Sequence, residues 1–152
     1  MEMLNEVAPI SGMIMQDIMD ECDPDSEVSI FEIHGTQDNV TYFDGDPNNN
    51  DGWGAYPSIP ETMTFFNNLF NLQLLSTENL PNTNTNDGST VTSEKYGSSN
   101  SCTEVWLYTV EGGGNSSRAK VCMKALNRLT MSSRRFQARW VKCRHALLTH
   151  MR

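Results

Sequence analysis

The sequence predicts an α/β fold in which parallel strands are joined through a crossover helix. The two best strand candidates are residues 27–34 and 104–110, because β-branched and aromatic side chains dominate both. Between them, a helix-start pattern begins at Ser58. Since parallel neighbours need a crossover element, the order strand, helix, strand favours a parallel sheet.

The first part of the chain predicts one more strand and a short helix. Residues 5–12 predict a short strand that runs into a turn at Ser11-Gly12. Residues 13–20 are rich in Met and Ile and predict a helical turn, which the acidic stretch up to Pro24 ends. Residues 35–57 are dense in Gly, Asp, Asn and Pro, so we expect a long loop there.

The crossover helix has a recognisable start. Ser58 can accept a hydrogen bond from the amide three residues on, Glu61 can reach back to complete a capping box, and Pro60 lies in the first turn, where its missing N–H costs nothing. Beyond the helix, residues 76–101 are mostly small and polar and predict a long excursion with a weak strand near 89–93. The helix itself should bury one apolar stripe against the sheet: Met63, Phe66, Phe70 and Leu74.

Charge divides the chain into two parts. Residues 1–114 carry all 19 acidic residues and one basic residue, Lys95, a formal charge of −18, whereas residues 115–152 carry ten basic residues and no acid. Such asymmetry marks either an interaction tail or two unrelated pieces of sequence. We therefore treat 1–114 as the folded portion and 115–152 as a basic tail, either helical, disordered or frame-shifted.

The composition also bears on compartment and partners. No run approaches the roughly 18 apolar residues that span a bilayer, and acidic residues replace the basic start of a signal peptide. None of the four cysteines forms a CxxC pair, so a zinc site is poorly supported. Cys22 and Cys102 could form a disulfide in an extracytoplasmic parent; the alternative is that each is a small free thiol.

Three segments carry a more specific signal. They are Val-Ala-Pro-Ile-Ser-Gly (7–12), Phe-Glu-Ile-His-Gly-Thr-Gln-Asp (31–38) with Tyr42 and Asp44-Gly45, and Glu-Val-Trp-Leu-Tyr-Thr-Val-Glu-Gly-Gly-Gly (104–114). Together they resemble the polyhydroxybutyrate depolymerase and feruloyl esterase group of α/β-hydrolases. The resemblance covers about residues 5–114. It implies an incomplete α/β-hydrolase fold, the carboxyl-terminal part of a secreted enzyme that cleaves carboxylic esters through a Ser-Asp-His triad without a cofactor or metal.

The resemblance assigns one catalytic residue. In that family the acid of the triad follows one parallel strand and the histidine follows the next, and both reach over the carboxyl edge of the sheet. Asp38 matches the acid. It would accept a hydrogen bond from the Nδ1–H of the histidine and stabilise the imidazolium that forms.

The chain departs from the family where catalysis depends on it. No Gly-x-Ser-x-Gly nucleophile elbow occurs, and the upstream oxyanion-hole loop is missing with it. Asn115 occupies the position of the histidine after the triple glycine. No other residue is a convincing substitute for the missing serine or histidine of the triad. His34 belongs to the strand-end motif, and Ser11 lacks an elbow glycine. The tail histidines, His145 and His150, lack the glycine loop that would orient them.

The primary interpretation is therefore an esterase fragment that is inactive alone. A reading-frame shift near Asn115 would explain both the lost histidine and the inverted charge, and it predicts that the adjacent frame encodes His-x-Trp-Pro-Gly. One alternative is an enzyme completed by a separately encoded N-terminal half. Another is a non-catalytic binding module whose tail docks on nucleic acid or an anionic surface, although no nucleic-acid-binding motif supports it.

One metal alternative also stays open. Acidic and amide residues alternate from Asp44 to Asn50 like the start of a calcium loop. The required Gly at position six and Glu at position twelve are absent, which excludes an EF-hand. A looser surface calcium site, or a solvated turn, fits the same residues.

Overall fold

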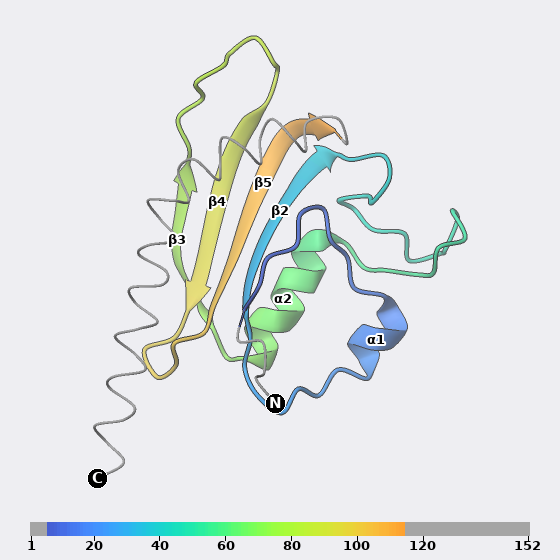
Figure 1. The fold of residues 1–152 in the computed structure, drawn as a ribbon, viewed down its shortest axis with the longest axis vertical. Coiled ribbons are helices and arrows are strands. Elements are labelled where there is room, and N and C mark those ends of the chain that lie inside the picture. Colours follow the sequence, from blue (N-terminus) through green and yellow to red (C-terminus); the bar gives the residue numbers. More distant parts are fainter. Residues whose placement is uncertain (1–5, 115–152) are drawn as a thin grey trace.

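The structure is a computed structural model that describes residues 6–114 of the 152-residue chain. Within these residues it forms a twisted five-stranded sheet and two helices (Figure 1). The predictions about Asn115, His145, His150 and the basic tail lie outside the described residues. In chain order the elements are β1 (Glu6–Val7), α1 (Gln16–Asp20), β2 (Ser29–Gln37), α2 (Ile59–Leu69), β3 (Gln73–Asn79), β4 (Thr90–Gly97) and β5 (Glu104–Gly114).

The sheet is mixed, with the strand order β1-β2-β5-β4-β3. β1 pairs with β2 and β2 pairs with β5 in parallel, as predicted for the three strands that were expected from the sequence. β4 runs antiparallel to both β5 and β3. The connections 80–89 and 98–103 are too short for a crossover, so their flanking strands can pair only antiparallel.

The long polar excursion predicted for residues 76–101 is wrong, whereas the weak strand predicted near residues 89–93 is confirmed by β4. Residues 76–101 contain most of β3 and all of β4. Nearly every residue of β3 is exposed. Because neither face of the strand is buried, its sequence lacks the alternation of apolar and polar residues that would indicate a strand. The backbone hydrogen bonds of β3 come from its pairing with β4, which pairs in turn with the buried strand β5. The local sequence of β3 does not indicate this pairing.

Helix α2 begins as predicted and ends earlier. Ser58 Oγ accepts from the Glu61 amide at 3.3 Å, and the Ser58 amide donates to Glu61 Oε2 at 2.9 Å, which completes the capping box. The helix ends at Leu69, and Asn71 takes a left-handed conformation with φ 51°. Leu74 therefore lies in β3, where it is 53% exposed, and does not extend the buried stripe.

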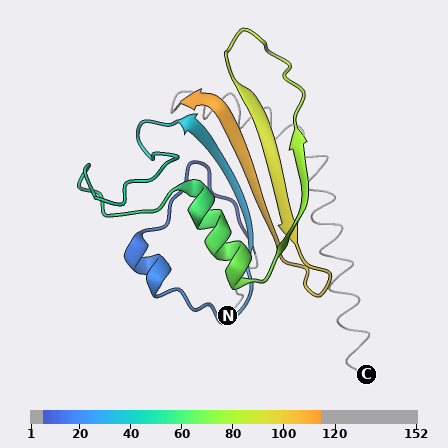
Figure 2. The same cartoon turned by 180° about the vertical axis from the view of Figure 1, so that it is seen from behind.

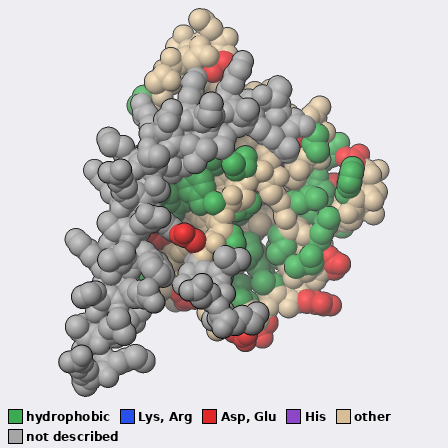
Figure 3. All heavy atoms as spheres, viewed as in Figure 1, with side chains coloured by type: hydrophobic (Ala, Val, Ile, Leu, Met, Phe, Trp, Pro, Cys, Tyr) green, Lys and Arg blue, Asp and Glu red, His purple; other side chains and the backbone are tan. Residues whose placement is uncertain are grey.

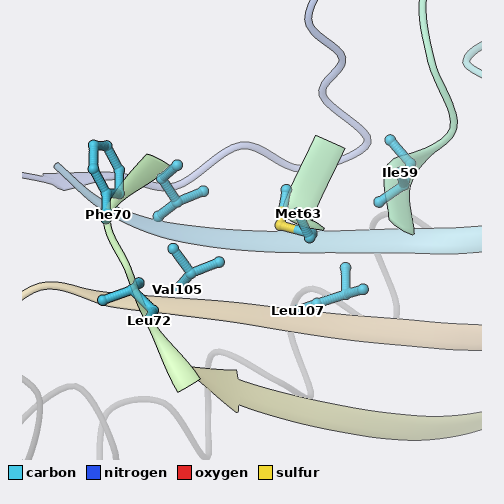
Figure 4. Close-up of a cluster of buried hydrophobic side chains, with 7 residues drawn as sticks. Ile59, Met63, Phe70, Leu72, Val105 and Leu107 are labelled. Carbon is cyan, nitrogen blue, oxygen red and sulfur yellow. The ribbon is translucent and has the colours of Figure 1, made fainter. Parts of the chain in front are cut away.

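One core lies between α2 and the sheet. Figure 4 shows Ile59 and Met63 of α2 directed at β2 and β5, where Val105 and Leu107 meet them. Phe70, just after the helix, and Leu72 close one end of the same cluster. The views from the front and from behind agree that α2 runs along β2 (Figures 1 and 2).

Strand β5 is buried on both faces. Val105 and Leu107 belong to the core under α2, while the alternate residues Trp106, Tyr108 and Val110 form a second cluster with Ile33. A strand covered on both sides has an unbroken apolar run in its sequence, which is why Val-Trp-Leu-Tyr stood out as a strand. No helix within residues 6–114 has the length and apolar character needed to cross a membrane.

Candidate functional site

The candidate site lies at the carboxyl edge shared by β2 and β5. Because the two strands are parallel neighbours, both end at this edge (Figure 1). The register brings Gln37 opposite Gly114, after an irregularity between Gly35 and Gln37. The Gly112 amide also donates to Thr36 Oγ1 at 3.0 Å. The end of β5 is thus bound to the backbone that leads directly into Asp38.

Asp38 is anchored in a tight turn at this edge. Its side chain is only 4% exposed. Oδ1 accepts hydrogen bonds from the amides of Val40 at 2.9 Å and Thr41 at 3.1 Å, and the Asp38 amide donates to the Gly35 carbonyl at 3.2 Å. A side chain that caps its own turn in this way has one preferred orientation. Asp38 therefore lies in a turn that its own side chain stabilises.

A buried acid–base pair lies directly behind that loop. Glu32 and His34 point to the same face of β2, are 2% and 0% exposed, and approach within 3.1 Å between Oε1 and Nδ1. His34 Nε2 lies 2.8 Å from the Thr41 carbonyl oxygen. Glu32 Oε1 also accepts from the Gly12 amide at 3.1 Å. The pair consequently connects the turn after β1 with the turn that holds Asp38.

The environment changes the acidity of Glu32. Burial raises the pKa of the Glu32 carboxyl, because removal from water disfavours its charged form. The hydrogen bond to His34, its charge and the amides of Gly12 and Ser11 act in the opposite direction and only partly offset burial. The pair matches the sequence-based interpretation of His34 as structural, since both ring nitrogens have partners within the protein.

The rest of the long loop is organised by Asp46. Its buried carboxylate accepts from the Asn50 and Asp51 amides at 2.9 and 3.0 Å and from Asn50 Nδ2 at 2.8 Å. These bonds lower the pKa of Asp46, because they stabilise the carboxylate. A hydrogen bond to Asp51 raises the pKa of the half-buried Tyr42. Two of the alternating residues of the calcium-loop alternative, Asp46 and Asn50, thus belong to a hydrogen-bonded turn.

The other candidates from the sequence within residues 6–114 are Cys22, Cys102 and Ser11. Cys22 is a free thiol and Cys102 is disulfide-bonded, so the structure does not contain the Cys22–Cys102 bridge that the sequence left open. Ser11 takes a left-handed conformation with φ 51° and uses its amide to bind the Ile33 carbonyl. It remains a turn residue.

The described surface is acidic. Figure 3 shows Asp and Glu side chains along the lower and right-hand parts of one face, around α1, with apolar side chains between them. Within residues 6–114, no three His, Cys, Asp or Glu side chains gather closely enough to hold a metal ion. Lys95, the basic residue of this part, lies 4.7 Å from the centre of the Trp106 ring.

Sequence reasoning missed the role of Glu32. The signal was present in residues 30–34, where Glu32 and His34 interrupt an otherwise apolar strand at alternate positions. Alternate residues of a strand face the same side, so two buried polar groups had to meet there. The sequence did not indicate that Gly12 bonds to Glu32 and Thr41 to His34, because only the fold brings these residues together.

Comparison with protein-family models, with curated proteins and with solved structures finds no match for this chain. The family resemblance therefore rests on the three sequence segments alone.

Proposed function

We propose that residues 6–114 are the carboxyl-terminal part of a serine-type carboxylic ester hydrolase, with Asp38 as the acid of its triad. The observation that carries the proposal is the pairing of Gln37 with Gly114. Asp38 directly follows Gln37 in the sequence, and position 115 directly follows Gly114. An acid and a histidine at these two positions would be close enough for the acid to orient the imidazole.

Two further features support the same arrangement. Asp38 is held in a single orientation by the Val40 and Thr41 amides, which is the preorganisation that a triad acid needs. The segments that carry the family resemblance also converge in space. The turn after β1 and the Asp38 loop are linked through Glu32 and His34.

The described residues supply only one part of the reaction. A serine becomes a nucleophile only when an imidazole removes its proton, and Asp38 can orient and stabilise that imidazole but not replace it. Position 115 is Asn, and the sequence has no Gly-x-Ser-x-Gly. The proposal therefore assigns no turnover to this chain alone, and it assigns a polyester, a feruloyl ester or a short acyl ester as substrate class to the parent enzyme.

The flanking nucleotide sequence provides the first test. We expect an upstream Gly-x-Ser-x-Gly motif and, in the frame adjacent to the codons after Gly114, the string His-x-Trp-Pro-Gly. A coding sequence restored with both segments should hydrolyse p-nitrophenyl butyrate and react with a fluorophosphonate at its elbow serine. The chain with Asn115 should do neither. Flanking sequence without either motif, or serine-dependent turnover by the present chain, would contradict the proposal.

A matched pair of variants tests Asp38 in the restored enzyme. Asp38→Asn should lower kcat by about 10⁴-fold, because the amide favours the wrong imidazole tautomer. Asp46→Asn is the control, since Asp46 is an equally buried acid on the same long loop but belongs to another turn. Equal losses in both variants, or full activity of Asp38→Asn, would remove Asp38 from the triad.

A further inference from the structure

We propose that Glu32 and His34 form a proton-sharing pair that positions Asp38, by locking His34 in its Nε2–H form against the Thr41 carbonyl. The role of Asp38 as triad acid rests on the function proposed above, whereas the network can be tested without catalysis. His34 and Glu32 would then be positioning residues, since neither touches a reacting atom.

The tautomer follows from the partners of the ring. A peptide carbonyl has no proton to give, so the 2.8 Å contact between Nε2 and the Thr41 oxygen requires the hydrogen to be on Nε2. The opposite neutral tautomer would direct the Nε2 lone pair at the carbonyl oxygen. It would also leave a buried acceptor without a donor, which is costly inside a protein.

One more proton lies between the two side chains. With Nε2–H fixed, the 3.1 Å contact between Nδ1 and Glu32 Oε1 contains either an imidazolium facing a carboxylate or a neutral imidazole facing a carboxylic acid. Both forms are neutral overall, and neutrality suits a pair that is almost fully buried. In both, Oε1 retains a lone pair for the Gly12 amide.

Thr41 transmits this arrangement to Asp38. Its carbonyl is held by His34, and its amide donates to Asp38 Oδ1 at 3.1 Å. The two bonds lie on either side of one α-carbon, so a shift of the carbonyl also moves the amide that orients the acid. Thr41 is itself buried.

The surroundings leave the pair little freedom. The Phe43 ring meets His34 edge-on, with 5.9 Å between ring centres. Two other ionisable groups bond to this loop: Asp38 accepts from the Thr41 amide, and the Tyr56 hydroxyl accepts from the Tyr42 amide. Glu32 and His34 are themselves almost completely buried, which further limits their freedom.

The test uses nitrogen NMR of the full chain with ¹⁵N-labelled histidine and three variants. Glu32→Gln keeps the His34 side of the network, because the Gln amide N–H can donate to Nδ1, but the Gly12 amide, which meets the same Oε1 position in the wild type, loses its acceptor. Glu32→Leu removes both contacts at similar volume. Glu94→Gln is the control, since it makes the same change of charge on β4, a strand that does not contact the Asp38 loop.

We expect His34 to carry its proton on Nε2 in the wild type, in Glu32→Gln and in Glu94→Gln. Hydrogen exchange at the Val40 and Thr41 amides should stay within about twofold in the latter two and become at least about tenfold faster in Glu32→Leu, the effect of losing one buried hydrogen bond. A proton on Nδ1 alone in the wild type, or unchanged exchange in Glu32→Leu, would overturn the proposal.

The remaining outcomes of these measurements are also decisive. If Glu32→Leu does not fold, the wild-type spectrum and Glu32→Gln still decide, because loss of loop protection in Glu32→Gln would refute a network that tolerates a neutral amide. A restored enzyme without esterase activity but with an intact Nε2–H network would refute only the proposed function. A wrong tautomer in an active restored enzyme would refute only the positioning pair.

Discussion

Gly35 and Gly113 approach so closely that a Cβ atom on Gly35 would lie 2.3 Å from the Gly113 carbonyl oxygen. The two glycines come from β2 and β5 and lie at the edge that carries Asp38. The contact involves backbone rather than a flexible side chain, so a larger residue cannot be accommodated by rotating a side chain away. The absence of a side chain on Gly35 thus permits the strand ends to meet.

Replacing Gly35 with Ala should destabilise the fold and separate the strand ends. We expect a loss of about 2–3 kcal/mol in the free energy of unfolding, the range for forcing an extra methyl group into a packed site, measured by urea denaturation of the full chain. Gly114→Ala is the matched control, because its added Cβ would lie 3.3 Å from the Gln37 carbonyl oxygen and needs only a small adjustment. Equal losses would show that the Gly35 contact is not special.

The carboxylate of Asp38 should stabilise its own turn. Asp38→Ala removes the acceptor for the Val40 and Thr41 amides and should lower the free energy of unfolding by about 1–2 kcal/mol. Asp38→Asn keeps an acceptor oxygen and should lose less. Denaturation of both variants measures the difference, and the turn would be independent of the side chain if Asp38→Ala were as stable as the wild type.

Glu32 should make stability depend on pH in a predictable direction. Burial raises its pKa above the ordinary value of 4.5 in the folded state, so the folded protein holds a proton that the unfolded chain has released. The stability from this group is complete below pH 4.5 and is lost as pH rises through the folded pKa, with a slope of at most about 1.4 kcal/mol per pH unit.

The comparison of wild type with Glu32→Gln isolates that slope. Gln does not titrate, so the wild type should lose stability relative to the variant as pH increases from 4.5. Asp46 and Glu61 have lowered pKa values and act with the opposite sign, but they are the same in both proteins and cancel. Thermal melts across the pH series measure the difference, and a difference that stays constant with pH would contradict the raised pKa of Glu32.

The capping box should contribute a measurable share of the stability of α2. Ser58→Ala removes the side-chain acceptor for the Glu61 amide and should cost about 1 kcal/mol. Ser58→Thr retains the hydroxyl and serves as the control. The free energies of unfolding of the two variants, measured by urea denaturation, should differ by this amount. A Ser58→Ala protein as stable as Ser58→Thr would show that solvent replaces the cap.

The sequence by itself determined the elements whose signals are local. The capping box at Ser58 depends on neighbouring residues, and the buried strands β2 and β5 are rich in β-branched and aromatic residues, so pattern and propensity were sufficient. The parallel pairing of β2 with β5 also followed, because a helix separates them. Asp38 was assigned from its place after a strand together with the family resemblance.

Tertiary structure alone decided the rest. β3 forms because β4, which pairs with β5, offers it a partner, and the exposed residues of β3 carry no period that predicts a strand. Of β4, the sequence indicated only a weak strand near residues 89–93. Leu74 continues the helical spacing but lies beyond the turn at Asn71, whose left-handed backbone no periodicity indicates. Glu32 and His34 were visible as polar interruptions, yet their link from Gly12 to Thr41 requires two loops distant in sequence to meet across β2. Hydrogen bonds between distant segments depend on which strands become neighbours, and that is a property of the whole fold.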